Sequence, residues 1–178
     1  MKLKQFNFKK VKSTNLTAIR IINSSKNEFG MVISETQSKG KGQYGRKWIS
    51  YKGNIFLSFF YKLENINLPL RSLTKKNCLL VKDVISKYYK KKITFKLPND
   101  LLINEKKICG ILQEKIEKTK KAYLIVGIGL NLVKNPNIPN YPATNLFKIT
   151  NQKINKKKFV KEVKISFEKF LSKYYKAI

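Results

Sequence analysis

Hydrophobic residues recur along this chain with two periods, which separate expected strands from expected helices. Runs rich in β-branched and aromatic residues, bounded by turn-forming residues, are typical of strands. Such runs occupy residues 3–11, 31–35, 54–63, 93–103, 107–114 and 123–132. Apolar residues three or four apart predict helices from residue 16, over 73–88 and from 156 onward. No internal repeat or flexible linker interrupts this order, and residues 135–142, with three prolines, are expected to form a loop.

Segments 93–103 and 107–114 are predicted to form a hairpin with residues 104–106 as its turn. Alternation along the first segment places Phe95 and Leu97 on one face and Lys96 on the other, away from the apolar core. Lys96 is therefore interpreted in one of two ways. It is either an exposed strand-end residue or a catalytic cation beside Asp100, a carboxylate able to bind a metal.

A glycine-spaced basic loop, SKGKGQYGRKW at residues 38–48, joins two of the predicted strands. Glycine permits positive φ and close approach of a ligand to the backbone. Successive backbone N–H groups in such a loop form an anion site, where Lys41, Arg46 and Lys47 add positive charge. The loop has neither the G-x-x-x-x-G-K-[ST] nor the G-x-G-x-x-G spacing. It is interpreted as a nucleotide site, with an ordinary solvated loop as the alternative.

Two further places combine small or polar residues with a predicted element. Ser13 and Thr14 precede the first helix, where their hydroxyls either cap the helix or bind a ligand. Gly127 and Gly129 lie in a buried strand, where the missing side chains permit a ligand to approach the backbone.

The charge balance is strongly basic, because 39 Lys and Arg face 10 Asp and Glu over 178 residues, a net charge of +29. Such a charge is typical of proteins that bind nucleic acid or anionic membranes. However, only Arg20, Arg46 and Arg71 are arginines, the residue type that recognises phosphates and bases by a bidentate fork. A compositional bias toward Lys, Asn and Ile explains the charge better. A basic nucleic-acid-binding protein stays as an alternative function, but no specific DNA binding is expected.

The cysteines and the N-terminal sequence bear on the cellular compartment. Cys78 and Cys109 have no C-x-x-C spacing, and the chain has no histidine. They are interpreted as buried thiols in a reducing compartment, and no metal site is expected. Residues 1–10 lack the apolar region of a signal peptide, and no apolar run reaches the roughly 18 residues that span a bilayer. The expectation is one cytoplasmic domain over residues 1–178, without a membrane partner.

Five short motifs, in one order along the chain, resemble those of the biotin protein ligases. GKGQYGRKW at residues 40–48 resembles the family's G-R-G-R-x-G-R-x-W, and KLPNDL at 96–101 resembles K-W-P-N-D-L. KICGILQE at 107–114 resembles K-x-x-G-I-L-x-E, while GIGLN at 127–131 and STN at 13–15 resemble two further family motifs. Any one of these matches alone is weak, but five in order make the resemblance specific.

The resemblance implies an α+β domain whose mixed sheet packs against helices, similar to the catalytic core of class II aminoacyl-tRNA synthetases and lipoate ligases. It implies a two-step reaction, in which ATP activates biotin to biotinyl-5'-AMP and biotin then passes to a lysine of the biotin carboxyl carrier protein. The carrier's acceptor domain is expected to be acidic. Mg²⁺ would accompany ATP and shield its negative charge.

The resemblance also implies roles for individual residues. Lys96 would be the catalytic cation at the carboxylate and α-phosphoryl oxygens. The biotin-binding residues would be Ser13, Thr14, Asn15, Gln37, Lys41, Gly42, Gln43 and Gly110. The nucleotide-binding residues would be Lys41, Gln43, Arg46, Trp48, Asn99, Lys107 and Asn131.

The chain also departs from the family pattern. Lys41 and Gln43 stand where the family has arginine, and Leu97 stands where it has tryptophan. The expectation is a catalytic domain alone, without the helix-turn-helix domain or the SH3-like domain of some members, as monomer or homodimer. A lipoate or octanoate ligase would share the fold and the chemistry. Its apolar ligand gives no reason for the polar side chains of Ser13, Thr14 and Gln37.

Overall fold

The structure, a computed structural model, describes residues 1–64, 66 and 68–175. These residues contain a seven-stranded sheet in the order β1-β2-β3-β7-β6-β5-β4. The strands are β1 (Lys4–Val11), β2 (Phe29–Gln37), β3 (Ile55–Lys62), β4 (Thr94–Lys96), β5 (Asp100–Ile103), β6 (Lys106–Lys118) and β7 (Lys121–Leu130). β1 pairs in parallel with β2, and the other neighbours pair antiparallel. The expected mixed sheet is confirmed.

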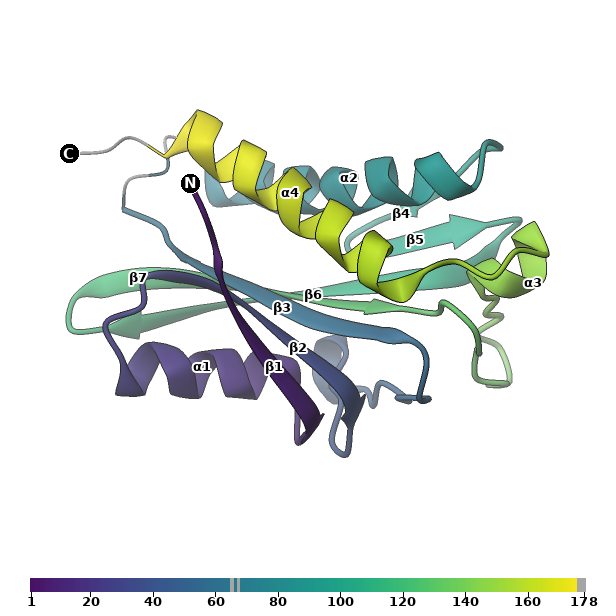
Figure 1. Cartoon of the computed structure of the whole chain (residues 1–178), viewed down its shortest axis with the longest axis horizontal. Coiled ribbons are helices and arrows are strands. Elements are labelled where there is room, and N and C mark those ends of the chain that lie inside the picture. Colours follow the sequence, from purple (N-terminus) through teal and green to yellow (C-terminus); the bar gives the residue numbers. More distant parts are fainter. Residues whose placement is uncertain (65, 67, 176–178) are drawn as a thin grey trace.

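Helices cover both faces of this sheet, as Figure 1 shows. They are α1 (Thr14–Ser24), α2 (Leu70–Tyr88), α3 (Leu146–Thr150) and α4 (Lys156–Tyr174), with a 3-10 turn η1 at Gln43–Gly45. The three predicted helices are confirmed, whereas α3 was not predicted. Over the described residues, no helix has both the length and the apolar character needed to cross a membrane.

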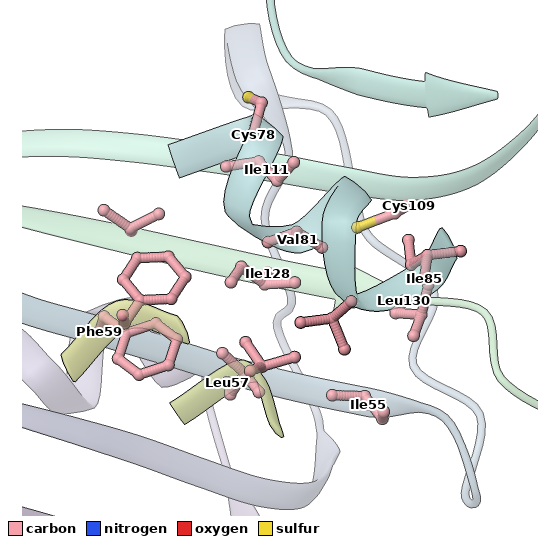
Figure 2. Close-up of a cluster of buried hydrophobic side chains, with 14 of the residues drawn as sticks. Ile55, Leu57, Phe59, Cys78, Val81, Ile85, Cys109, Ile111, Ile128 and Leu130 are labelled. Carbon is pink, nitrogen blue, oxygen red and sulfur yellow. The ribbon is translucent and has the colours of Figure 1, made fainter. Parts of the chain in front are cut away.

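The main hydrophobic core fills the space between the sheet and the layer of α2 and α4 (Figure 2). Phe59 of β3 stacks on Phe167 of α4, with ring centroids 3.8 Å apart and planes at 12°. Cys78 of α2 and Cys109 of β6 are free and buried in this core, as predicted. Burial raises the pKa of the Cys78 thiol to about 12 and holds the pKa of the Cys109 thiol well above its usual range.

On the opposite face, α1 covers only part of the sheet. Ala18 and Ile22, one turn apart, are fully buried in a second cluster that includes Phe60 of β3 and Ile125 of β7. The buried stripe of α1 therefore runs through Ala18 and Ile22, while Leu16 stays half-buried.

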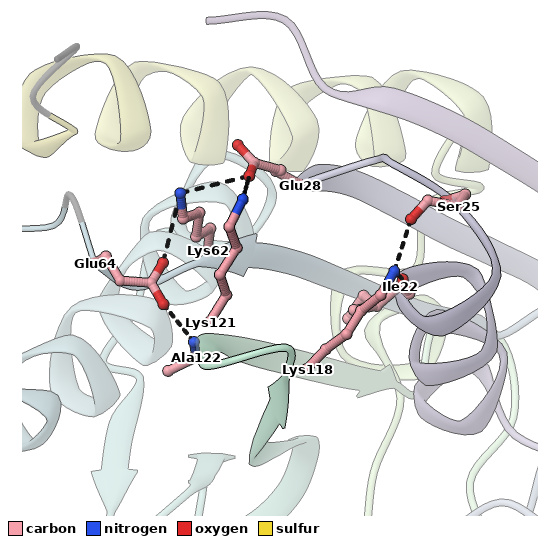
Figure 3. Close-up of polar contacts among 8 residues, drawn as sticks. All are labelled: Ile22, Ser25, Glu28, Lys62, Glu64, Lys118, Lys121 and Ala122. Carbon is pink, nitrogen blue, oxygen red and sulfur yellow. Dashed lines mark hydrogen bonds and ion pairs between the residues drawn. The ribbon is translucent and has the colours of Figure 1, made fainter.

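Polar contacts fix the end of α1 and the neighbouring strand ends (Figure 3). The ammonium of Lys118 donates hydrogen bonds to the carbonyls of Ile22 and Ser25, which satisfies acceptors at the C-terminal end of α1. Glu28 forms ion pairs with Lys121 at 3.1 Å and Lys62 at 3.4 Å. The hydrogen bond from Lys121 and the charges of both lysines hold the pKa of Glu28 below its usual value.

The predicted single strand over residues 93–103 is wrong. The chain reverses at residues 97–99, so that β4 and β5 lie antiparallel and Lys96 pairs with Asp100. Pro98 has no N–H to donate to a strand ladder, which favours a turn at this place. Leu97, expected on the core face, is 77% exposed because it belongs to the turn. Lys96 is exposed, as predicted, and the hairpin of β5 and β6 is confirmed.

Candidate active site

A cavity of about 540 Å³ lies beside the N-terminus of α1. Its walls come from the start of α1, the glycine loop, the turn between β4 and β5, and the loop over residues 136–143. Every site residue predicted from the sequence contributes to its lining: Ser13, Thr14, Asn15, Gln37, Lys41, Gly42, Gln43, Arg46, Trp48, Lys96, Asn99, Lys107, Gly110 and Asn131. Motifs that are far apart along the chain therefore meet in one cavity.

Glycines in β6 and β7 make room for side chains of this site. A Cβ atom at Gly127 would lie 2.2 Å from Oδ1 of Asn15, and one at Gly129 would lie 2.4 Å from Cε2 of Trp48. A Cβ atom at Gly110 would lie 2.8 Å from the Trp48 ring. The space above these glycines, which was expected to admit a ligand, thus holds Asn15 and Trp48.

The side chain of Asn15 is engaged by the protein on both sides. Its Oδ1 accepts a hydrogen bond from Ser58 at 2.5 Å, and its Nδ2 donates to Glu114 Oε2 at 2.6 Å and to the Leu112 carbonyl at 3.3 Å. Ser58 belongs to β3, whereas Leu112 and Glu114 belong to β6. Asn15 therefore connects the first turn of α1 to β3 and β6. Its predicted contact with biotin stays a prediction.

Thr14 and Gln37 form a second polar group in the cavity wall. Oε1 of Gln37 accepts hydrogen bonds from the backbone N–H of Thr14 at 2.8 Å and from its hydroxyl at 3.1 Å. The amide of Gln37 donates to Ser50 at 3.2 Å. Ser13 occupies the N-cap position without a capping hydrogen bond from its side chain. Ser13 therefore holds the predicted N-cap position, but its hydroxyl does not cap the helix, and the Thr14 hydroxyl donates to Gln37 instead.

The glycine loop is held in a narrow turn. The N–H of Gly42 donates to the Arg46 carbonyl at 2.7 Å, and the N–H of Trp48 donates to the Gly40 carbonyl at 2.9 Å. Tyr44 and Gly45 have positive φ values of 54° and 73°. The guanidinium of Arg46 lies 5.0 Å from the ring centroid of Tyr141 on the opposite wall.

The charges in the cavity lining are strongly unbalanced. The basic residues are Lys41, Arg46, Lys47, Lys96 and Lys107, whereas Asp100 is the acidic residue among the described residues of the lining. Asp100 is not free, because its Oδ1 lies 2.8 Å from Nζ of Lys107. Lys107 also lies 5.2 Å from the centroid of the Trp48 ring. The cavity therefore presents excess positive charge, which suits an anionic ligand.

Apart from Oδ1 of Asp100, which forms an ion pair with Lys107, two buried polar atoms of the lining have no hydrogen-bond partner in residues 1–64, 66 and 68–175. They are the indole N–H of Trp48 and the Oδ1 atom of Asn131. Buried polar atoms in folded proteins are normally paired, so a ligand with a matching acceptor and donor would complete both. Sequence reasoning missed Ser50 and Tyr141, because neither residue lies in one of the five motifs.

The family profile described as "Biotin/lipoate A/B protein ligase family" matches residues 7–131. The chain belongs to this family. A relative in the family, the bifunctional ligase/repressor BirA of Bacillus subtilis (strain 168), is 31% identical over 168 residues, which are 88% of this chain and 50% of that protein. The biotin–[acetyl-CoA-carboxylase] ligase of Mycobacterium tuberculosis is 28% identical over 142 residues, 75% of this chain and 51% of that protein. The chain thus spans about half the length of these relatives.

The fold agrees with this membership. The structure of the biotin protein ligase from Aquifex aeolicus in complex with biotin and ATP matches with a TM-score of 0.79 and 28% sequence identity. The match covers 97% of this chain and 72% of that chain. It confirms the α+β fold of a biotin ligase catalytic domain that the five motifs implied.

Proposed function

We propose that this chain is a biotin protein ligase, which converts biotin and ATP to biotinyl-5'-AMP and transfers biotin to a lysine of a biotin carboxyl carrier protein. The observation that carries the proposal is the meeting of all five motifs in one cationic cavity. The named activities of the relatives and the biotin and ATP bound to the Aquifex aeolicus protein support it.

The polarity of the cavity suggests how the two substrates lie. The hydroxyls and amide of Ser13, Thr14 and Gln37 suit the ureido head of biotin, which both donates and accepts hydrogen bonds. Lys41, Gln43, Arg46 and Lys107 suit the phosphates of ATP. The unpaired indole N–H of Trp48 and the unpaired oxygen of Asn131 suit the edge of a base.

In the first step, a carboxylate oxygen of biotin attacks the α-phosphorus of ATP, and the bond to pyrophosphate breaks. Two negatively charged groups must come into contact. Lys96 lines the cavity as an exposed cation and forms no ion pair within the described part of the chain. It would neutralise the charge that builds up on the oxygens between biotin and phosphorus. A preorganised charge of this kind contributes roughly 3 kcal/mol to catalysis.

Mg²⁺ enters this proposal as the companion of ATP. The described residues contain no group of three or more His, Cys, Asp or Glu able to hold a metal. The carboxylate in the cavity, Asp100, is paired with Lys107. Mg²⁺ often binds through substrate phosphates and keeps several waters, so the protein need not build a cage for it. When bound to the phosphates, it would shield their charge.

In the second step, the amine of the carrier lysine attacks the acyl carbon of biotinyl-5'-AMP, and AMP leaves. Because Asp100 is paired with Lys107, the other basic residues of the lining leave the cavity positively charged, which suits an acidic carrier. The two free, buried thiols suit a reducing location such as the cytoplasm.

The decisive experiment is ATP–pyrophosphate exchange in the presence of biotin, lipoate or neither compound. The expected result is exchange that depends on biotin and Mg²⁺. Equal exchange with lipoate, or none with biotin, would contradict the proposal. A lipoate or octanoate ligase is the second candidate, because the matched family includes lipoate ligases.

The role of Lys96 can be tested by single-turnover formation of the adenylate. Lys96→Ala is expected to lower the rate at least 100-fold, because roughly 3 kcal/mol of charge stabilisation is lost. Lys92→Ala is the matched control, since Lys92 is also exposed but lies outside the cavity lining. A near wild-type rate for Lys96→Ala would identify Lys96 as an ordinary strand-end lysine.

A further inference from the structure

The mouth of the cavity gathers the most exposed hydrophobic side chains of the molecule. In the described part of the chain, the three large hydrophobic residues with the greatest exposure are Tyr44 at 90%, Leu97 at 77% and Tyr141 at 55%. All three belong to the cavity lining, and Ile138, 38% exposed, lies there as well. We call these four side chains the apolar rim.

The clustering of these exposed hydrophobic side chains at one place indicates a binding surface. Single exposed hydrophobic residues are normal on soluble proteins, but a group of them at one place marks a binding surface. The members of the apolar rim come from three separate segments: the glycine loop, the turn between β4 and β5, and the loop after β7. The fold thus brings together at one mouth side chains that the sequence keeps apart.

Exposed cations surround the apolar rim. Lys41, Lys47 and Lys96 are exposed, line the same cavity, and form no ion pair within the described residues. Apolar and aromatic side chains beside unpaired positive charges form a surface that complements apolar and acidic side chains on a partner.

We propose that the apolar rim is the docking surface for the carrier domain, with acidic and apolar side chains of the carrier lying around its acceptor lysine. This inference rests on the proposed function and adds to it the surface that recognises the protein substrate. The acceptor amine must reach an acyl carbon inside the cavity, so the carrier surface around that lysine must cover the mouth. The rim then becomes buried against the carrier.

The test separates the two half-reactions. Leu97→Asn and Tyr44→Asn each replace an exposed apolar group by a neutral polar one, which adds no negative charge beside Lys96 or the phosphate-binding loop, and Asn tolerates the positive φ at residue 44. Leu70→Asn is the matched control, because Leu70 is 47% exposed and begins α2, outside the cavity lining. Thermal unfolding should be similar in all variants, since none of these side chains is buried.

Three measurements are made on each variant: biotin-dependent ATP–pyrophosphate exchange, transfer of biotin to hydroxylamine as a small acceptor, and transfer to the purified apo carrier domain of acetyl-CoA carboxylase. The rim variants should keep exchange and hydroxylamine transfer within twofold of wild type. Their KM for the carrier should rise roughly tenfold, as expected at the centre of a protein interface. Leu70→Asn should leave all three unchanged.

Each other outcome overturns the inference in a recognisable way. A changed KM for biotin or ATP would mean that the rim closes over the small substrates. If the KM for the carrier and the exchange rate both stay at the wild-type value, the apolar rim is not the docking surface, while the proposed function still stands. If the wild-type protein shows no biotin-dependent exchange, the proposed function is wrong, and this inference is wrong with it.

Discussion

The two faces of the sheet differ in the side-chain volume that the same strands present, and β7 shows the difference within a few residues. Four of its residues join the core beneath α2 and α4: Leu124, Val126, Ile128 and Leu130. The residues between them change from Ile125, packed in the cluster with α1, to Gly127 and Gly129 in the cavity lining. One face is filled with apolar side chains of the strands, while on the other the glycines leave room for Asn15 and Trp48, which line the cavity. Substitutions on the first face should therefore alter stability, and those on the second should alter ligand binding.

Phe167→Ala should have the largest effect on stability. Phe167 is fully buried and stacked on Phe59, so its loss removes a large apolar contact and leaves a cavity. The free energy of unfolding, measured by urea denaturation, should fall by about 4 kcal/mol. Ile165→Ala on the same helix is the control, because Ile165 is 39% exposed and its loss should cost much less. A loss below about 1 kcal/mol for Phe167→Ala would show that this face is not a closely packed core.

The buried thiols of the core face should make the protein less stable at alkaline pH. Burial raises the folded-state pKa of Cys78 and Cys109 above the ordinary value of 9.0, so the folded protein keeps protons that the unfolded chain loses. Their stabilising contribution is full below about pH 9 and is lost as the pH rises toward the folded-state pKa. Between pH 8 and pH 10, the two thiols together should lower the free energy of unfolding by about 3 kcal/mol.

Comparison with the double variant Cys78→Ala, Cys109→Ala isolates this contribution from that of lysine and tyrosine. Urea denaturation of both proteins at a series of pH values gives, for each protein, the slope of the free energy of unfolding against pH. The double variant should lose clearly less stability over this pH range than the wild type. Parallel slopes would contradict the assignment of the alkaline effect to the two thiols.

The local elements of the fold could be predicted from the sequence, because periodicity is a local property. The helices at Thr14–Ser24, Leu70–Tyr88 and Lys156–Tyr174 follow from the spacing of apolar residues. The break at residues 97–99 was missed, although Pro98 and Asn99 are turn-forming residues, because an apolar run resumes at residues 101–103 directly after it. The short helix α3 was missed because five residues are too few to show a helical period.

The composition of the site could be predicted from motifs, but not its contacts. Lys107 pairs with Asp100 across two neighbouring strands, a contact that depends on the register of β5 and β6. Asn15 is held by Ser58 and Glu114, each more than 40 residues away along the chain. Side chains brought together by strand pairing leave no periodic signal in a single sequence, so the motifs identify residues without showing which of them already have partners.

Gly129→Ala should weaken ATP binding about tenfold, and its effect on the free energy of unfolding should be smaller. Its Cβ atom would lie 2.4 Å from Trp48, which must therefore move. Trp48 is the sole tryptophan of the chain, so its fluorescence reports this displacement directly. The emission should shift to longer wavelength as the indole becomes more exposed. The KM for ATP in pyrophosphate exchange should rise roughly tenfold, equivalent to about 1.4 kcal/mol of lost binding.

Gly42→Ala is the matched control for this displacement. The nearest atom to its Cβ would be the Arg46 carbonyl oxygen at 3.5 Å, an ordinary van der Waals contact. Its tryptophan emission should therefore match that of the wild type. If Gly129→Ala also leaves both emission and KM unchanged, the glycines of β7 are not what gives Trp48 its place in the cavity.

Gln43→Arg should have the smallest effect, and it tests how the open face holds its ligand. Gln43 lines the cavity between Lys41 and Arg46 in the glycine loop, where the family pattern has arginine. An arginine can offer the phosphate of the adenylate a bidentate, charged pair, whereas glutamine offers a neutral donor. Charged hydrogen bonds exceed neutral ones by roughly 1 kcal/mol, which corresponds to about a fivefold change in affinity.

Affinity differences between related complexes lie mostly in the dissociation rate, so Gln43→Arg should slow release of biotinyl-5'-AMP about fivefold without slowing its formation. Released adenylate acylates exposed lysines without selection, and the variant should therefore biotinylate a bystander protein less than the wild type when no carrier is present. Gln43→Lys adds charge without the planar fork and should fall between the two. Dissociation rates measured after a chase with unlabelled biotin and ATP decide the matter. Equal rates for all three proteins would mean that Lys41 and Arg46 already supply the charge that the phosphate needs.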